Sequence, residues 1–294
     1  MTVVEHLEGQ WRQWRHDHVA EMFRPYGWTA LVAQHWLRPG DEGVELDDLP
    51  GTWSVADGRV IFTPPATGPT LAVDGSHPTD PVEIVPGRNQ TYGHGRSVPV
   101  YFGVCEVETI ERSDNAGNRL FAVRVRDPRS AASAGDAGVR AFDYDPTWRI
   151  PGVFTPFDRR DVEAETVEAG VRELTPHIGT FTFTHAGASH EVVVLGKETA
   201  TGVQPVVHFR DATNGDLTYG AGRVVEIDFV DDGAPHPARI DWIDFNYAVA
   251  LPCAFTNFVT CPLPPAQNRL DLAVRAGEQR PARDVARVLT FDEE

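Results

Sequence analysis

Short runs of β-forming residues, repeated along most of the chain, constrain the fold more than any other feature. From about Gly51 onward, β-branched and aromatic residues alternate or cluster over a few positions, and turn residues separate the runs. The predicted strands lie at 52–55, 59–62, 82–85, 98–104, 120–125, 179–184, 191–195, 206–209, 224–229 and 240–245. Regular short strands of this kind indicate a β-sandwich or β-barrel.

The first residues predict a helix instead. Trp11, Trp14 and Met22 recur at near-helical spacing between charged residues, so we expect one amphipathic helix over Val3–Phe23. Residues 27–37 are predicted to form a second, short helix. The fold class is therefore mainly β, with an N-terminal helical segment followed by two antiparallel sandwich- or barrel-like parts.

Changes in composition predict where these parts meet. Residues 130–139 are rich in Ala, Gly and Ser, and residues 158–173 are charged, so both stretches are interpreted as seams. We expect an N-terminal helical segment at 1–45, a first β part at 46–126 and a C-terminal β domain at 127–294.

The pattern Thr-Tyr-Gly-x-Gly-Arg occurs twice, at 91–96 and at 218–223. A β-rich run follows each copy, which is typical of an internal duplication. The order of the neighbouring strand differs between the copies, so a turn sequence that arose twice independently is an equal alternative.

Charge, hydropathy and cysteine content restrict the environment and the partners. A net charge of −17 argues against nucleic acid and against an anionic membrane surface as partners. No apolar window approaches the length of a membrane span, and the first residues lack the apolar core of a signal peptide. Three cysteines fit a reducing compartment. We therefore expect a cytoplasmic protein whose partner is a small-molecule ligand.

The segment 241–270 is the strongest functional signal. It begins with an acid and an amide two positions apart and continues through two cysteines, each beside a proline, to an Asn-Arg pair. Its prolines fix φ and remove backbone donors, so side chains and surroundings must hold the segment in place. A long ordered loop of this kind usually carries a function.

These residues resemble the C-terminal signature of the domain-of-unknown-function 1684 family, which runs roughly DFN-x-AYNPPCA, then CPLPP-x-x-NRL, then AGE. Residues 209–223 (FRDATNGDLTYGAGR) and 124–130 (RVRDPRS) are similar to further motifs of that family, so the resemblance covers nearly the whole chain. Its members are bacterial and archaeal proteins without an established activity, so the resemblance implies no reaction. Val249, Ala250 and Leu251 stand where the family has a tyrosine, an asparagine and a proline.

Asp244 is the first candidate for a catalytic base. On the predicted strand, Asp244 and Asn246 share one face, and the apolar run that follows suggests a buried neighbourhood. A carboxylate buried there needs a partner or a raised pKa, which is the usual preparation for acid–base chemistry. Tyr219 is then the candidate proton donor, and Asn246 the orienting group. The alternative is a buried polar network that fixes the proline-rich segment.

A turn and an arginine are the candidates for substrate binding. Asp211 and Thr213 lie in a turn sequence close to Arg223, and neighbouring glycines let a ligand approach. Arg223 suits a bidentate clamp for a carboxylate or phosphate. It is equally suited to an ion pair inside the fold, with Asp211 or with Asp244.

The end of the segment offers further candidates. Asn268 and Arg269 either contact substrate from a lid or cap the loop. Cys253 and Cys261 are a catalytic thiol, metal ligands, a disulfide or packed small hydrophobic residues. Their spacing does not match a metal site, so we expect no metal.

Missing motifs narrow the chemistry. The chain has no phosphate-binding loop, dinucleotide-binding glycine pattern, G-x-S-x-G elbow or HExxH helix, so we expect no cofactor. The leading hypothesis is a small-molecule enzyme that uses cofactor-independent acid–base chemistry on a polar or anionic substrate in a β-barrel or sandwich pocket. One alternative is a non-catalytic ligand-binding or scaffold module. Another is a thiol- or metal-dependent enzyme that uses Cys253 and Cys261.

Overall fold

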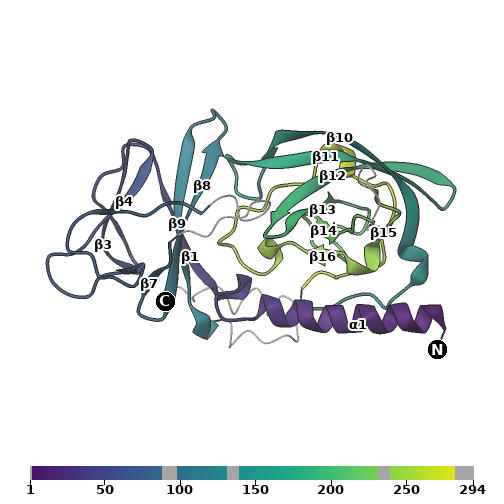
Figure 1. Cartoon of the computed structure of the whole chain (residues 1–294), viewed down its shortest axis with the longest axis horizontal. Coiled ribbons are helices and arrows are strands. Elements are labelled where there is room, and N and C mark those ends of the chain that lie inside the picture. The colour runs from purple at the N-terminus through teal and green to yellow at the C-terminus, as the bar shows by residue number, and fades with distance from the viewer. Residues whose placement is uncertain (1, 88–97, 131–138, 231–238, 282–294) are drawn as a thin grey trace.

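The computed structural model describes residues 2–87, 98–130, 139–230 and 239–281 (Figure 1). The first Thr-Tyr-Gly-x-Gly-Arg copy, at 91–96, lies outside the described residues, as does most of the Ala-, Gly- and Ser-rich stretch.

A single long helix, α1 (Val3–Met22), begins the chain, as the spacing of its apolar residues predicts. Thr2 and Glu5 form a capping box at its start, which satisfies backbone donors of the first turn. The Trp11 side chain is buried, and its Nε1–H donates to the Asn246 carbonyl at 2.8 Å. The helix is thereby attached to residues 241–270, the signature segment, near the other end of the chain.

The second predicted helix is wrong. After a short 3-10 turn, η1 (Trp28–Ala30), the chain forms strand β1 (Leu31–Leu37), which pairs antiparallel with β9 (Arg119–Arg126). The pairing with β9 determines this conformation, because it gives the backbone of β1 hydrogen-bond partners and buries Leu31 and Leu37. Helical spacing of apolar residues in so short a segment cannot outweigh such a partner.

Antiparallel strands make up the rest of the fold, in two open sheets over the described residues. The large sheet follows the order β1-β9-β8-β11-β12-β13-β14-β16, with β5, β7, β10 and β15 attached beside this path, and the small sheet follows β2-β3-β4-β6. The further members of the large sheet are β5 (Ala72–Val73), β7 (Val100–Phe102), β8 (Cys105–Asp114), β10 (Arg149–Glu165), β11 (Val171–His185), β12 (Ala188–Thr199), β13 (Gly202–Phe209), β14 (Arg223–Glu226), β15 (Trp242–Asp244) and β16 (Val249–Ala250). The small sheet contains β2 (Val44–Leu46), β3 (Leu49–Ala56), β4 (Arg59–Thr63) and β6 (Val82–Glu83). Short 3-10 turns lie at η2 (Pro146–Trp148), η3 (Phe245–Tyr247), η4 (Pro252–Ala254) and η5 (Ala266–Asn268).

The mainly β fold class is confirmed, and each predicted run overlaps a strand. The charged stretch at 158–173 is not a seam, however. It forms the outer part of the long β10–β11 hairpin, whose register continues to Glu165 opposite Arg172. The hairpin escapes prediction because most side chains of β10 there are exposed on both faces, so no apolar alternation marks the strand.

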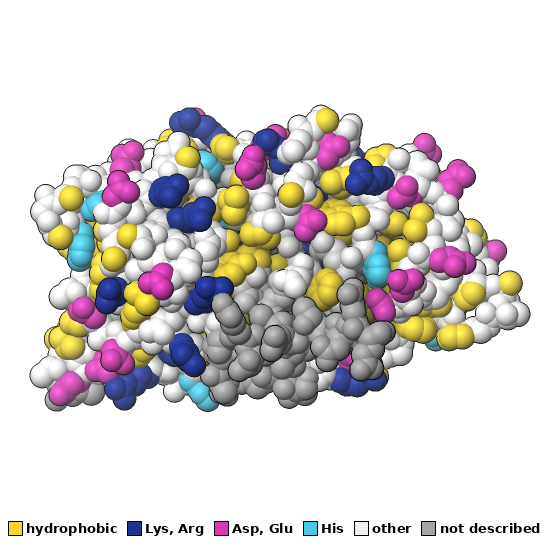
Figure 2. Space-filling view, turned by 180° about the vertical axis from the view of Figure 1, so that it is seen from behind, with side chains coloured by type: hydrophobic (Ala, Val, Ile, Leu, Met, Phe, Trp, Pro, Cys, Tyr) yellow, Lys and Arg dark blue, Asp and Glu magenta, His cyan; other side chains and the backbone are white. Residues whose placement is uncertain are grey.

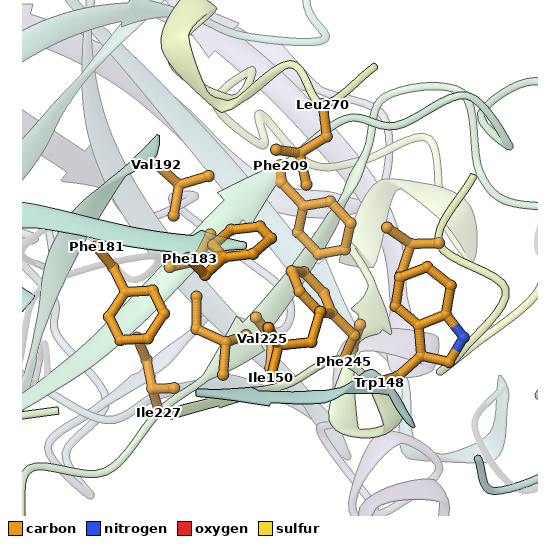
Figure 3. Close-up of a cluster of buried hydrophobic side chains, with 14 of the residues drawn as sticks. Trp148, Ile150, Phe181, Phe183, Val192, Phe209, Val225, Ile227, Phe245 and Leu270 are labelled. Carbon is orange, nitrogen blue, oxygen red and sulfur yellow. The ribbon is translucent and has the colours of Figure 1, made fainter. Parts of the chain in front are cut away.

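The two largest hydrophobic clusters of the described residues form separate cores. One lies between the small sheet and the β1-β9-β8 part of the large sheet, around Trp53, Phe62 and Phe121. The other fills the C-terminal half and includes Trp148, Ile150, Phe181, Phe183, Val192, Phe209, Val225, Ile227, Phe245 and Leu270 (Figure 3). Strands β8 and β9 face the first core with one side only, which leaves their other side to meet the C-terminal half.

Candidate functional site

Strand alternation places a row of charged side chains between the two cores. In β9, Phe121, Val123 and Val125 point into the first core. Arg124 and Arg126 alternate with them and therefore face the opposite way. Glu108 of β8 pairs in register with Arg124 and belongs to the same side.

This charged side borders a cavity of about 790 Å³. The lining comes from both halves of the chain and includes His18, Glu21, Met22, Arg24, Tyr26, Gly27, Trp28, Pro99, Tyr101, Glu106, Glu108, Arg112, Arg124, Arg126, Lys197, Val206, Val224, Glu226, Val249, Ala250, Leu251, Pro252, Phe255, Val259, Thr260 and Cys261. Figure 1 shows the segment after β16, in yellow-green, entering the space between the C-terminal strands and β8. A hydrogen bond from Thr256 Oγ1 to the Leu31 carbonyl fastens that segment to β1.

Arg124 is a buried charge of the cavity with incomplete hydrogen bonding. The residue is only 1% exposed. Nε donates to Gln34 Oε1 at 2.8 Å, and Nη1 lies 3.7 Å from Glu108 Oε1, but Nη2 has no hydrogen-bond partner. Burial lowers the pKa of Arg124 to about 10, because a cation is costly away from water. A ligand oxygen would supply the missing acceptor.

Two further arginines are held rigidly beside it. Arg126 donates through Nη1 to the Gly27 carbonyl and through Nη2 to Glu108, and it stacks over the ring of Trp28. Arg112 donates through Nε to Thr260 Oγ1 at 2.8 Å, and its Nη2 lies 3.4 Å from Glu173 Oε2. The site is therefore preorganised before any ligand arrives.

The signature segment supplies an apolar wall. Leu251, Phe255 and Val259 line the cavity and pack in hydrophobic clusters of this segment. Val249, Ala250 and Leu251, the positions that depart from the family pattern, all belong to this wall. The departure therefore changes the lining of the cavity.

Ion pairs and polar groups surround the mouth. Lys197, the single lysine of the chain, pairs with Glu226 at 2.8 Å, and both line the cavity. His18 of α1 lies 3.4 Å from the buried carboxylate of Glu278, which also accepts the Ala250 N–H. Figure 2 shows positive and negative side chains interspersed over the face that it presents, so no broad patch of one sign dominates that face.

The predicted binding residues Arg223, Asp211 and Thr213 form an internal network. Arg223 is fully buried, and its Nη2 lies 3.3 Å from Asp211 Oδ2. The guanidinium also donates to the carbonyls of Val274 and Ala276, and the Thr213 hydroxyl donates to Asp211. The internal ion pair is thus present, and none of the three predicted residues lines the cavity.

Asp244 and Asn246 do come together, although by a different route from the predicted strand. Asp244 ends β15 and caps η3, which contains Asn246, so Oδ1 of Asp244 accepts the backbone N–H and the Nδ2–H of Asn246. The strand alternation predicted for this pair is wrong at Asn246. Burial raises the pKa of Asp244, and Arg149 stands 4.0 Å away.

Tyr219 belongs to another group. Its hydroxyl donates to the Cys253 carbonyl at 2.7 Å, and burial raises its pKa. Cys253 and Cys261 pack in one hydrophobic cluster, and both are free. Asp244, Tyr219 and Arg223 therefore lie in three separate hydrogen-bonded groups.

Asn268 and Arg269 have contrasting surroundings. Asn268 is fully buried and joins β12 to β13: Oδ1 accepts the Val193 N–H, and Nδ2 donates to the carbonyls of Val193 and His208. Arg269 is exposed, and its backbone bridges to Arg210. The 209–223 segment therefore lies against the signature segment, as the sequence indicates.

The sequence interpretation missed Arg112, Arg124 and Arg126. The signal was available for two of them, because RVRDPRS places Arg124 and Arg126 two positions apart in a β run. Within the described ranges, no group of three or more His, Cys, Asp and Glu residues is arranged to hold a metal ion. No helix in those ranges has the length and apolar character needed to cross a membrane.

Comparisons with known proteins place the chain in a family. Residues 136–279 match the model of a protein family of unknown function, DUF1684. No curated protein matches the chain. Among solved structures, the chain is similar to an uncharacterized protein of Haloarcula marismortui determined by solution NMR, at 28% identity and a TM-score of 0.39, over 48% of this chain and 76% of the other. Through residues 136–279, the chain belongs to the DUF1684 family.

Proposed function

We propose that the protein binds a small organic anion, with a carboxylate head and an apolar body, in the cavity between β8–β9 and the signature segment. The unpartnered Nη2 of Arg124 carries this proposal. A buried guanidinium without an acceptor loses the hydrogen bonds that water would give it, and a carboxylate restores them.

The balance of buried charge favours the same ligand. Arg112, Arg124 and Arg126 are buried, and the carboxylates of Glu108 and Glu173 are the acids within ion-pair distance of them among the described residues. Three positive and two negative groups leave one net positive charge. A single bound carboxylate would neutralise it, although the chain as a whole is strongly acidic.

The opposite wall favours an apolar body on that anion. Leu251, Phe255 and Val259 present hydrocarbon to the cavity, together with Val206 and Val224. Burying apolar ligand surface against them contributes about 0.8 kcal/mol per methylene group. Inorganic phosphate would use the arginines and leave this wall without a contact.

The arrangement supports ligand binding rather than the acid–base hypothesis. A shared reaction centre requires a base, an acid and an anion clamp within reach of one substrate. Asp244, Tyr219 and Arg223 lie in separate groups and do not line the cavity.

Isothermal titration calorimetry with a series of straight-chain and aromatic monocarboxylates tests the proposal, with inorganic phosphate as a comparison. Affinity should rise with apolar length until the cavity is full. Arg124→Gln should weaken binding at least about tenfold, because a charge-assisted hydrogen bond contributes roughly 1.5–3 kcal/mol.

Arg119→Gln is the matched control, since Arg119 lies on the same strand but is exposed and paired with Glu111. It should bind as the unmodified protein does. The proposal fails if no acid in the series binds, or if Arg124→Gln and Arg119→Gln bind equally well.

A further inference from the structure

A pair of thiols beside the cavity has no part in anion binding. Cys253 lies in η4 and Cys261 follows it in the same segment, and both pack in one hydrophobic cluster. The two thiols lie near enough for each to shift the pKa of the other. Two free thiols are thus neighbours in the fold, although the sequence separates them by a loop that contains Phe255 and Val259.

Backbone and side-chain contacts hold both cysteines in place. The Tyr219 hydroxyl donates to the Cys253 carbonyl at 2.7 Å. The Cys261 carbonyl accepts the Val167 N–H at 2.9 Å, and Pro262 forms a β-bridge with Thr166. The proximity of the two cysteines is therefore built into the fold.

The two thiols differ in accessibility and acidity. Cys253 is partly exposed, whereas Cys261 is buried and lines the cavity. The hydrogen bonds from Cys261 and Tyr219 lower the pKa of Cys253, while burial raises that of Cys261. The more accessible sulfur is thus the better nucleophile, and the buried one stands behind it.

We propose that Cys253 and Cys261 form a redox-active dithiol, which a small hydroperoxide oxidises reversibly to an intramolecular disulfide. In the first step, the Cys253 thiolate attacks the outer peroxide oxygen. An S–O bond forms, the O–O bond breaks, and the leaving alkoxide takes up a proton and departs as an alcohol.

In the second step, the Cys261 sulfur attacks the Cys253 sulfenic acid. The S–S bond forms, the S–O bond breaks, and hydroxide leaves as water with the proton of the Cys261 thiol. The dithiol loses two electrons and two protons, and the hydroperoxide is reduced to an alcohol and water. A dithiol reductant reverses the reaction by thiol–disulfide exchange.

Intact-mass spectrometry of the full chain tests the proposal in a Cys105→Ser background, which removes the third cysteine. After treatment with hydrogen peroxide and alkylation of remaining thiols, the protein should lose two hydrogen atoms and take up no alkyl group. Dithiothreitol should restore two alkylatable thiols.

Single variants test the assigned order. With Cys261→Ser, Cys253 should gain oxygen because no second thiol can attack its sulfenic acid. With Cys253→Ser, Cys261 should react with peroxide at least about tenfold more slowly than the pair. Tyr219→Phe keeps the ring and removes the hydrogen bond, so it should raise the pH at which Cys253 becomes reactive.

The proposal is overturned if peroxide leaves both cysteines alkylatable, or if each sulfur gains oxygen without forming a disulfide. These masses are measured without any ligand in the cavity. Their outcome is therefore independent of whether the protein binds a carboxylate.

Discussion

Two arginines in different parts of the molecule are almost equally buried, yet only one of them lines a cavity. Arg223 is 0% exposed and Arg124 is 1% exposed. Both Nη atoms of Arg223 are satisfied, by Asp211 and by carbonyls of the chain's C-terminal part, and its one unpartnered atom, Nε, is in a guanidinium stacked over the ring of Phe209. The unpartnered Nη2 of Arg124 belongs to a side chain that lines a cavity.

The comparison separates structural charges from charges available to a ligand. Burial alone does not distinguish them, and neither does proximity to a family motif, because both arginines lie in one. What distinguishes them is whether each buried charge is neutralised within the fold. Arg223 and Asp211 form a balanced pair, whereas Arg112, Arg124 and Arg126 share two buried carboxylates.

Replacing these arginines should give the largest effect on stability at Arg223. Arg223→Gln leaves Asp211 buried without its cation, which costs about 3–5 kcal/mol. Arg124→Gln should change the free energy of unfolding by no more than about 1 kcal/mol, since two arginines then face two carboxylates. Urea unfolding measures both. Equal losses at the two positions would remove the distinction between the network and the cavity.

The sequence predicts which face of β9 carries the arginines, but it does not predict what covers that face. The run FAVRVR predicts that Arg124 and Arg126 share a face opposite Val123 and Val125, by strand alternation alone. What covers that face depends on contacts such as the hydrogen bond between Thr256 and Leu31, far apart in the chain. No local pattern encodes contacts of this kind, and they make the arginine face a cavity wall.

The same limit applies to the predicted binding residues. Arg223, Asp211 and Asn268 lie in family motifs, and the 209–223 segment does lie against the signature segment. Their partners follow from tertiary structure: Arg223 meets Asp211 across the β13–β14 turn, and Asn268 reaches β12. A polar residue in a motif is equally suited to binding a ligand and to satisfying buried backbone groups.

The affinity for a carboxylate should fall at alkaline pH, because Arg124 then loses its charge. Because burial lowers its pKa to about 10, Arg124 remains charged near neutrality and loses its charge at a lower pH than an ordinary arginine. Binding measured by calorimetry should be constant from about pH 7 to 9 and weaken about tenfold or more as pH rises beyond 10.

Lys197→Arg is the control for this experiment, because it removes the chain's single lysine and keeps the positive charge. The decline should persist in that variant and should be absent from Arg124→Gln, whose binding is already weak. A decline that disappears with Lys197→Arg would assign the titration to the mouth of the cavity instead.

The apolar wall should set ligand length. Val249→Tyr restores the family residue at a position that lines the cavity, and its larger ring takes up space there. The longer acids should lose the roughly 0.8 kcal/mol that each buried methylene contributes, while acetate should bind as before. If Val249→Tyr weakens all acids by the same factor, the wall contacts the head of the ligand and not its body.

The smallest effect is expected at Asp244, a partly buried charge outside the cavity with Arg149 4.0 Å away. Burial raises its pKa in the folded state above the ordinary value. The folded protein then binds more protons than the unfolded chain between these two values, so stability should fall as pH rises through that window.

Asn in place of Asp244 can still accept both hydrogen bonds from Asn246 and carries no charge. Asp244→Asn should therefore leave stability unchanged at low pH and raise it modestly near neutrality, by less than the loss at Arg223, in thermal melts across pH. A marked loss at neutral pH would instead place Asp244 with Arg223, among the charges that the fold requires.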